Sequence, residues 1–388
     1  MNLPCCLLAV GLSTSTVNTE QSGWPGLINR RKSQDNPPPT AKILLCSANY
    51  IDNMTRTSDP PAQARRVCLL AQPRTASHLL TKMLGLEKQE HVHWDQQKSH
   101  LSLKPYMSIL DMLDKLPGSE WSDKELQEGR LAFQECYDNL NEYIASGEAD
   151  GKTVIFLKEH ANHLCDLTLH FPEHQQLPGG RKRFNVTSSL PETTDNPTVF
   201  PSAFLQAWTP IFLLRHPALV FPSLCRASSK LLGVSMLDNG PAGKRFRDKM
   251  WVAMSFSETR ELYDWYTDYY EACGDENNVI LLDAHDFMLH PHIVEKVAET
   301  IGLDKSKVQQ TWSPSTSNLT PIQQAFGQTV RSSSGIKKER APEHIDTAKE
   351  AVKWKEEFGE VGAALIASRV EAAMPDYEYL RTKRTWVD

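Results

Sequence analysis

The sequence predicts an α/β fold in which a parallel sheet is covered by helices on both faces. Four short apolar segments each have the length and composition of a buried strand. They are VCLLA (67–71), TVIFLKEH (153–160), PIFLLRH (210–216) and NVILLD (278–283). Segments with helical periodicity separate them, and strands that alternate with helices are typical of parallel sheets.

Cap signals and periodicity place the helices. Ser122 and Glu125 form a capping box and Gly147 supplies a stop, so residues 122–146 predict a helix. Residues 246–272 predict one long helix rich in Trp and Tyr, whose rings are expected mainly in the core. Further helices are expected after Pro217, at 290–303 and at 343–372.

The chain is expected to have three parts. Residues 1–64 are polar and proline-rich and predict a disordered tail. Residues 65–342 predict the α/β domain, and residues 343–388 a helical extension packed on it. The polar segment 170–201 within the domain predicts a mobile flap.

The composition excludes several classes of protein. The 388 residues are 40% hydrophobic and 23% charged, which is ordinary for a globular protein. A net charge of −6 argues against a nucleic-acid partner. The sequence has no run of 18 apolar residues, so no membrane-spanning helix is expected. The start of the chain lacks a basic region and a clear cleavage site, and the cysteines form no C-x-x-C pair, so a cytoplasmic, reduced protein is expected.

The stretch QPRTASHLL (72–80) has the features of an anion site between a strand and a helix. Backbone N–H groups at the start of a helix lack partners and point at one spot. Thr75 and Ser77 add hydroxyl donors, and Arg74 adds a permanent charge that suits phosphate or sulfate. The alternative is that these residues only cap the helix.

A second stretch, SGEADGKT (146–153), nearly spells the P-loop pattern. That pattern follows a strand and opens a helix, whereas this stretch precedes a strand. It therefore predicts a helix end and a turn.

Two further strand ends carry candidate functional groups. Arg215 ends the third strand, with Ser223 eight residues later, and Lys158, His160 and His163 end the second. Ligands of parallel sheets collect at the carboxyl ends of the strands, so these groups can share one ligand. His accepts protons near neutral pH, and Lys neutralises charge on a leaving oxygen. The alternatives are an Arg215–carboxylate pair, a solvent-facing Ser223 and histidines that only form structural hydrogen bonds.

These motifs, in this order, resemble the sulfotransferases. QPRTASHLL is similar to their 5′-phosphosulfate loop, and Arg215 with Ser223 matches their 3′-phosphate motif, including the spacing. FLKEHANHL (156–164) is similar to the strand end that carries their catalytic base. NVILLDAHDFMLHPHIVEKVAETIGL (278–303) resembles their late strand and the helix after it. The pattern favours a divergent, fungal-type branch.

The resemblance covers residues 65–303 and implies a P-loop NTPase-like, three-layer architecture. It also implies transfer of a sulfuryl group from 3′-phosphoadenosine 5′-phosphosulfate (PAPS) to a hydroxyl or amine of a small organic acceptor, without a metal. We expect such an enzyme to act in secondary metabolism. The identity of the acceptor and the oligomeric state do not follow from the sequence.

The resemblance assigns roles to individual residues. His160 would deprotonate the acceptor, and Lys158 would stabilise charge on the bridging oxygen. Arg74, the third expected catalytic residue, would cradle the 5′-phosphosulfate together with the loop. Arg215 and Ser223 would hold the 3′-phosphate. Residues of the loop, with two more from the polar segment 329–338, complete the expected donor site: Arg74, Thr75, Ala76, Ser77, His78, Leu79, Arg331 and Ser333.

Three departures from the family pattern keep other functions open. Ala76 stands where the family has glycine, His78 replaces a threonine, and Pro222 interrupts the helix that should present Ser223. The same fold could catalyse a step without sulfation, such as dehydration, cyclisation or rearrangement of a metabolite. An ATP-dependent kinase is disfavoured by the missing GK[ST] sequence, and a non-catalytic module by the Lys158–His160 pair.

Overall fold

The centre of the fold is a five-stranded sheet in which every pair of neighbouring strands is parallel. In this computed structural model, residues 63–112, 122–166, 184–190, 196–275, 278–315 and 319–387 are described. The strand order is β2-β3-β1-β4-β5. The strands are β1 (Arg65–Ala71), β2 (Val92–His93), β3 (Val154–His160), β4 (Thr209–Leu214) and β5 (Ile280–Asp283). The four predicted strands are present, and β2, with two residues, is too short to leave a pattern in the sequence.

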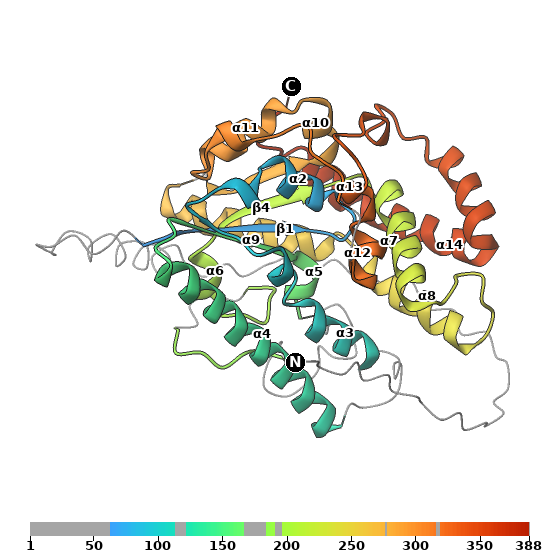
Figure 1. Ribbon diagram of the computed structural model, residues 1–388. Helices are drawn as coiled ribbons and strands as arrows, with labels where there is room; N and C mark the ends of the chain where they lie inside the picture. The colour runs from blue at the N-terminus through green and yellow to red at the C-terminus, as the bar shows by residue number, and fades with distance from the viewer. Residues whose placement is uncertain are drawn as a thin grey trace, which may run out of the picture. The chain divides into compact units, whose positions relative to one another are not determined.

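Helices cover both faces of the sheet, which confirms the predicted three-layer α/β fold (Figure 1). The helices of one face are α2 (Ser77–Met83), α10 (Ala284–Leu289) and α11 (His292–Thr300). Those of the other face are α3 (Leu103–Met112), α4 (Asp123–Ala149), α5 (Ala161–Leu164), α6 (Ser202–Gln206), α7 (Pro217–Leu232), α8 (Pro241–Ala253), α9 (Ser257–Cys273) and α14 (Thr347–Arg381). The short helices α12 (Pro321–Phe326) and α13 (Gln328–Arg331) lie before α14 in the chain.

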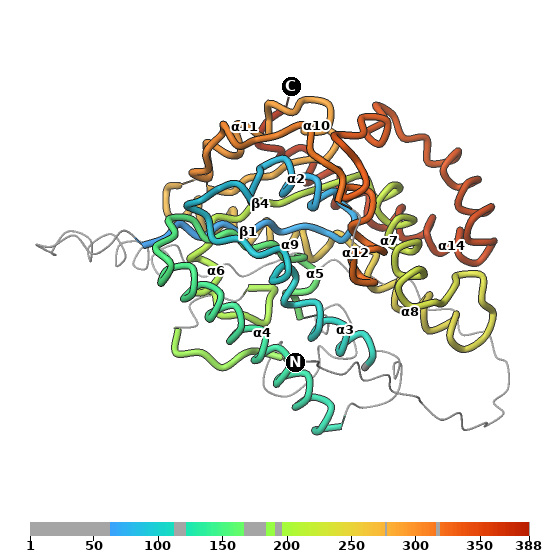
Figure 2. The backbone as a smooth tube through the Cα atoms, in the orientation of Figure 1, coloured from blue at the N-terminus to red at the C-terminus, as the bar shows by residue number. Residues whose placement is uncertain are grey.

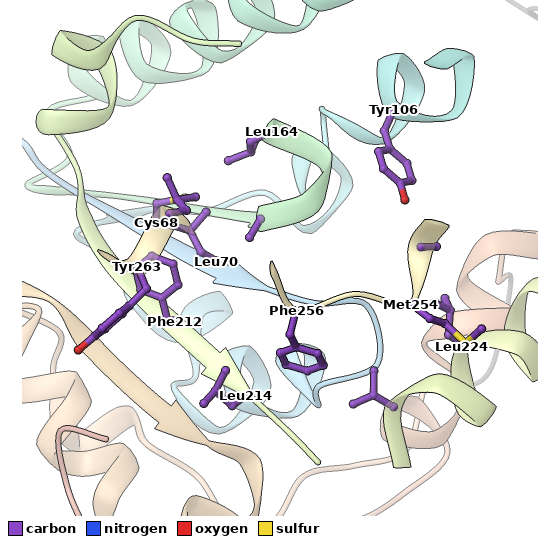
Figure 3. Packing of buried hydrophobic residues seen from close by; sticks show 14 of the residues in the cluster. Cys68, Leu70, Tyr106, Leu164, Phe212, Leu214, Leu224, Met254, Phe256 and Tyr263 are labelled. Carbon is purple, nitrogen blue, oxygen red and sulfur yellow. The ribbon is translucent and has the colours of Figure 1, made fainter. Parts of the chain in front are cut away.

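The alternation of side chains along each strand supplies both cores. Cys68 and Leu70 of β1 lie in the larger cluster with Phe212 and Leu214 of β4, as Figure 3 shows. The residues between them belong to the cluster on the opposite face. Because successive side chains of a strand point to opposite faces, an uninterrupted apolar run is what a sheet covered on both faces requires.

One helix prediction needs correction. Residues 246–272 are not one helix, because α8 and α9 are separated at Met254–Phe256. The carbonyl of Met254 accepts a hydrogen bond from Nε of Arg369 at 2.9 Å, and that of Ser255 accepts one from Nε2 of Gln72 at 2.7 Å. These distant side chains use carbonyls that a continuous helix would keep for itself. The helix predicted at 290–303 is present as α11, and the separate short helix α10 precedes it.

Helix α4 has the predicted capping box at Ser122 and Glu125, but it does not end at Gly147. Gly147 lies inside the helix and is buried against His93 of β2. The helix ends at Ala149, and Gly151 in the turn that follows has a φ of 66°. The stretch 146–153 is therefore a helix end and a turn before β3, as predicted.

The C-terminal helix α14 packs beside α7 and α8, as the trace in Figure 2 shows. It bends at Gly359, where φ is 70° and ψ is 179°. Tyr377 and Leu380 of α14 are buried in the larger core, and the Tyr377 hydroxyl donates to Oδ2 of Asp283 at 2.7 Å. The division of the chain into a domain and an extension stays a prediction. The tail at 1–64 lies almost wholly outside the described residues, as does much of the flap at 170–201.

None of the helices that the structure describes has both the length and the apolar character needed to cross a membrane. Most of the aromatic rings at 251–270 are core residues, as predicted.

The position of Gly147 predicts a loss of stability for Gly147→Ala. A Cβ atom there would lie 2.8 Å from Cγ and 2.9 Å from Cβ of His93. Overpacking of this kind costs about 1–3 kcal/mol, which exceeds the ~1 kcal/mol that alanine gains over glycine in a helix. Urea denaturation measures the change. Ala145→Gly, on the exposed side of the same helix, measures the difference in helix propensity between alanine and glycine alone. A Gly147→Ala variant more stable than the parent would contradict the close contact between Gly147 and His93.

Candidate active site

The predicted site residues meet because β1, β3 and β4 end at one edge of the sheet. The register pairs Ala71 with His160 on one side and with Leu213 on the other. The loop after β1, the end of β3 and Arg215 after β4 are therefore neighbours, although they are far apart in the sequence.

The loop after β1 has a backbone conformation that is unusual for its residues. Arg74 and Ala76 both have left-handed φ angles, of 76° and 70°. Ala76, at the position where the family pattern has glycine, is thus left-handed. Thr75 is buried, and its hydroxyl donates to the Gln72 carbonyl at 2.8 Å, so it holds the turn together. Ser77 opens α2 and is also buried.

Arg74 contacts both Ser223 and Arg215. Nε of Arg74 donates to Oγ of Ser223 at 3.0 Å, and Nη1 of Arg74 donates to the carbonyl of Phe326. Arg215 donates to the carbonyls of Arg74, at 3.4 Å, and Arg340, at 3.0 Å. In the part of the chain that the structure describes, neither Arg74 nor Arg215 forms a salt bridge with a carboxylate. Pro222 does not break α7, which presents Ser223 within a continuous helix.

Burial and neighbouring positive charges lower the pKa of both arginines. Burial, followed by the charges of Arg215, Arg226 and Arg340, lowers the pKa of Arg74 to about 10. Burial and Arg340 also lower the pKa of Arg215, against the opposing effect of Asp283. Buried like charges repel one another, so an anion bound among them would be stabilised.

Lys158 is almost fully buried at the end of β3. Its Nζ lies 3.3 Å from Nδ1 of His78. Burial lowers the pKa of Lys158 to about 7, with Arg74 contributing in the same direction and Glu159 opposing. A lysine of this kind changes its charge near neutral pH, which is uncommon outside functional sites.

His160 is held in one tautomer by the neighbouring strand. Its Nδ1 lies 3.1 Å from the Ala71 carbonyl oxygen, which can only accept, so Nδ1 carries the hydrogen. Nε2 is then the acceptor of the neutral ring. Burial, His163 and Lys158 hold the pKa of His160 well below its usual value, so the ring is neutral at neutral pH.

A second layer of residues around His160 was not predicted. The ring of His100 stacks on that of His160 with centroids 4.0 Å apart, and the backbone N–H of His100 donates to the Lys158 carbonyl at 2.9 Å. Glu159 accepts from the N–H and hydroxyl groups of Ser102, which fixes the same segment on β3. The segment at 96–102 matches no motif, and the left-handed φ of 65° at His100 leaves no signal in the sequence.

The other side of His160 is lined by buried polar groups. His163 lies 4.9 Å from His160 between ring centroids and stacks on Tyr106, whose hydroxyl accepts a hydrogen bond from Asn162. Among the described residues, Oδ1 of Asn162 and Nδ1 of His163 have no hydrogen-bond partner. His163 is thus part of the surroundings of His160.

A cavity of about 170 Å³ adjoins α2 and extends the site. It is lined by His78, Trp94, Gln96, Trp312 and Arg331, among others. Nη2 of Arg331 donates to Oε1 of Gln96 at 2.9 Å.

Two of the predicted donor-site residues have other contacts. Ser333 does not line the cavity, and its hydroxyl donates to the carbonyl of Val330 at 2.9 Å. Leu79 packs in the core against the sheet. The structure thus brings Arg331 to His78, but it does not place Ser333 or Leu79 at the cavity.

Two curated relatives match this chain along nearly their whole length. "Sulfotransferase ppzF" of Metarhizium rileyi is 31% identical over 344 residues, which are 84% of this chain and 98% of that protein. The protein of the same name from Metarhizium majus is 32% identical over 353 residues, which are 86% of this chain and 100% of that protein. The chain belongs to the sulfotransferase family.

The relatives confirm the family prediction, including a divergent fungal branch, and with it the prediction of an enzyme. No family model matches this sulfotransferase. A solved structure described as the sulfotransferase domain from the curacin biosynthetic pathway is 13% identical, and the match covers 80% of this chain and 98% of that one. Its TM-score of 0.27 is too low to bear on the fold or the activity.

The left-handed backbone at Ala76 predicts that Ala76→Gly stabilises the protein. A side chain at such a φ costs roughly 1–2 kcal/mol, which glycine avoids, so we expect a gain of about 1 kcal/mol in unfolding free energy. Ala367→Gly, at an exposed position of α14, is the control and should lose stability. An equal loss in both variants, measured by urea denaturation, would show that the loop is not held in this conformation.

Proposed function

We propose that this enzyme transfers a sulfuryl group from PAPS to a hydroxyl or amine of a small organic acceptor, in secondary metabolism. The observation that carries the proposal is the cluster of Arg74, Arg215 and Ser223. Two partly buried guanidinium groups lie there with hydroxyl and carbonyl partners, which is the arrangement that a phosphate group would complete.

The geometry suggests how the donor is shared among the residues. Arg215 and Ser223 would hold the 3′-phosphate, while Arg74 and the loop N–H groups would hold the 5′-phosphosulfate. The cavity beside α2 offers Trp94 and Trp312 to a planar base, and Arg331 to an anionic group. Aromatic side chains bind nucleobases by stacking, and such contacts are worth about 1–3 kcal/mol per base.

The proposed chemistry uses the protonation states found at the end of β3. The sulfur forms a bond to the acceptor oxygen or nitrogen and breaks its bond to the phosphate oxygen of the donor. Nε2 of His160, the free acceptor of a neutral ring, receives the proton of the acceptor. Lys158, in its ammonium form, stabilises the negative charge that remains on the phosphate oxygen.

A step without sulfation on the same fold is the alternative. Ala76 in place of glycine and His78 in place of a hydroxyl residue are the features that favour it. Such an enzyme would also need a proton acceptor at His160, but it would not need to recognise a 3′-phosphate. Binding of the donor product, 3′-phosphoadenosine 5′-phosphate (PAP), therefore separates the two functions.

The first test is Arg215→Ala, assayed by calorimetry with PAP and with AMP. Charged hydrogen bonds are worth roughly 1.5–3 kcal/mol, so PAP should bind about ten- to a hundredfold more weakly, whereas AMP should be almost unaffected. Arg245→Ala removes the same charge from an exposed position on α8 and should change neither affinity. Failure of the parent protein to bind PAP, or equal losses for PAP and AMP, would overturn the proposal.

The second test is His160→Ala, assayed by steady-state kinetics with the native acceptor and by PAP binding. A general base contributes about 10²–10⁴ in rate, so kcat should fall at least about a hundredfold. PAP affinity should stay within about twofold, because the base acts on the acceptor. The exposed His344 provides the control, His344→Ala. His163 is unsuitable because it contacts His160. Full activity in a folded His160→Ala variant would make His160 a structural residue.

A further inference from the structure

His78 connects the buried Lys158 with the cavity beside α2. Its Nδ1 lies 3.3 Å from Nζ of Lys158, and the residue also lines the cavity, together with Trp94 and Arg331. Among the side chains that the structure describes, Nδ1 of His78 is the one acceptor within hydrogen-bond distance of the Lys158 ammonium. The carboxylate of Glu159, the next residue in β3, is engaged instead with Ser102.

The contact determines which nitrogen of His78 carries the hydrogen. A lysine ammonium has donors only, so Nδ1 must accept and the neutral ring has its hydrogen on Nε2. The charge of Lys158, followed by burial and the charges of Arg74 and Arg331, holds the pKa of His78 well below its usual value. The ring therefore stays neutral, with an acceptor at one nitrogen and a donor at the other.

The imidazoles nearby do not compete for Lys158. His160 uses Nδ1 on the Ala71 carbonyl, and His100 is stacked on His160 with the two ring planes 24° apart. Among the described residues, neither ring forms a hydrogen bond with Nζ of Lys158. Lys158 thus depends on His78 for its position.

We propose that His78 acts on two sides: Nδ1 positions the Lys158 ammonium, and Nε2–H donates to an anionic oxygen of the phosphosulfate donor. The inference rests on the proposed function and deepens it. A hydroxyl residue at this position would offer one oxygen to the donor, whereas the imidazole also links donor binding to the group that stabilises the leaving oxygen. His78 is then a donor-binding residue and a positioning residue for Lys158.

Two amide variants of His78 distinguish the role of Nδ1 from the role of Nε2. The amide of Asn lies near the position of Nδ1, so His78→Asn keeps the contact with Lys158 and loses the donor at Nε2. The amide of Gln reaches the position of Nε2, so His78→Gln keeps that donor and loses the contact with Lys158. His78→Asn should therefore weaken PAP binding about tenfold but keep kcat, at saturating PAPS, within about threefold of the parent. His78→Gln should keep PAP affinity within about twofold but lower kcat at least about tenfold. Thermal melting of both variants establishes that they are folded.

The pH dependence provides a readout that a structural role would not move. The pKa of Lys158 is about 7, so kcat/KM of the parent should fall as the pH rises through 7 and the ammonium is lost. A hydrogen-bond acceptor stabilises the ammonium, so its removal lowers the pKa of Lys158 further. Arg74 lowers this pKa and Glu159 raises it in the parent and both variants alike. The falling limb should move to lower pH in His78→Gln and stay in place in His78→Asn.

The outcomes that would overturn the role of His78 differ from those that would overturn the use of PAPS as the donor. Absence of PAP binding in the parent overturns the proposed function itself. PAP binding in the parent, with both variants impaired in the same property or in none, overturns only the two-sided role of His78. Should either amide variant unfold, His78→Ala decides: the proposal requires losses in both PAP affinity and kcat, and the loss of one alone contradicts it.

Discussion

The parallel pairing of β1 with β3 is the interaction on which the site depends. The register places Ala71 opposite His160, and the Ala71 carbonyl then selects the tautomer of the His160 ring. A shift of one residue would turn Lys158 and His160 to the other face of the sheet and Glu159 toward the cavity side. On its other side β1 pairs with β4, which brings Arg215 to the loop of Arg74. The backbone hydrogen bonds of three strands thus set the geometry of side chains that no local sequence holds together.

The site concentrates buried charge at the end of one strand. Lys158 and Glu159 are adjacent, both almost fully buried, and they point to opposite faces. Burial raises the pKa of Glu159 to about 7 and lowers that of Lys158 to about 7, so each carries its charge only partly at neutral pH. Buried charges are tolerated when partners satisfy them. Ser102 satisfies Glu159 and in doing so fixes the segment that carries His100, so the acid contributes to the site without facing the ligand.

The residues at the strand ends could be predicted because polar side chains directly follow buried apolar runs. Arg74, Lys158, His160 and Arg215 all belong to this group. His100 could not be predicted, since its position depends on a left-handed backbone and on contacts with β3, some sixty residues later in the chain. The break between α8 and α9 was missed for a similar reason: its carbonyls are bonded by side chains of distant segments. Gly147 misled the prediction because glycine serves close packing as well as helix ends. Ala76 was singled out because the family pattern has glycine there, but its left-handed φ angle cannot be read from an alanine.

The C-terminal helix also constrains when the protein can finish folding during its synthesis. β5 is an edge strand, and the backbone of Leu281 exchanges hydrogen bonds with Thr385, which lies beyond α14. Tyr377 and Leu380 complete the larger core. Strands β1 to β4, and with them every residue around His160, leave the ribosome well before these partners exist. Until then the edge at β5 is open and the part of the larger core that Tyr377 and Leu380 complete is exposed, a state in which association with other chains competes with folding.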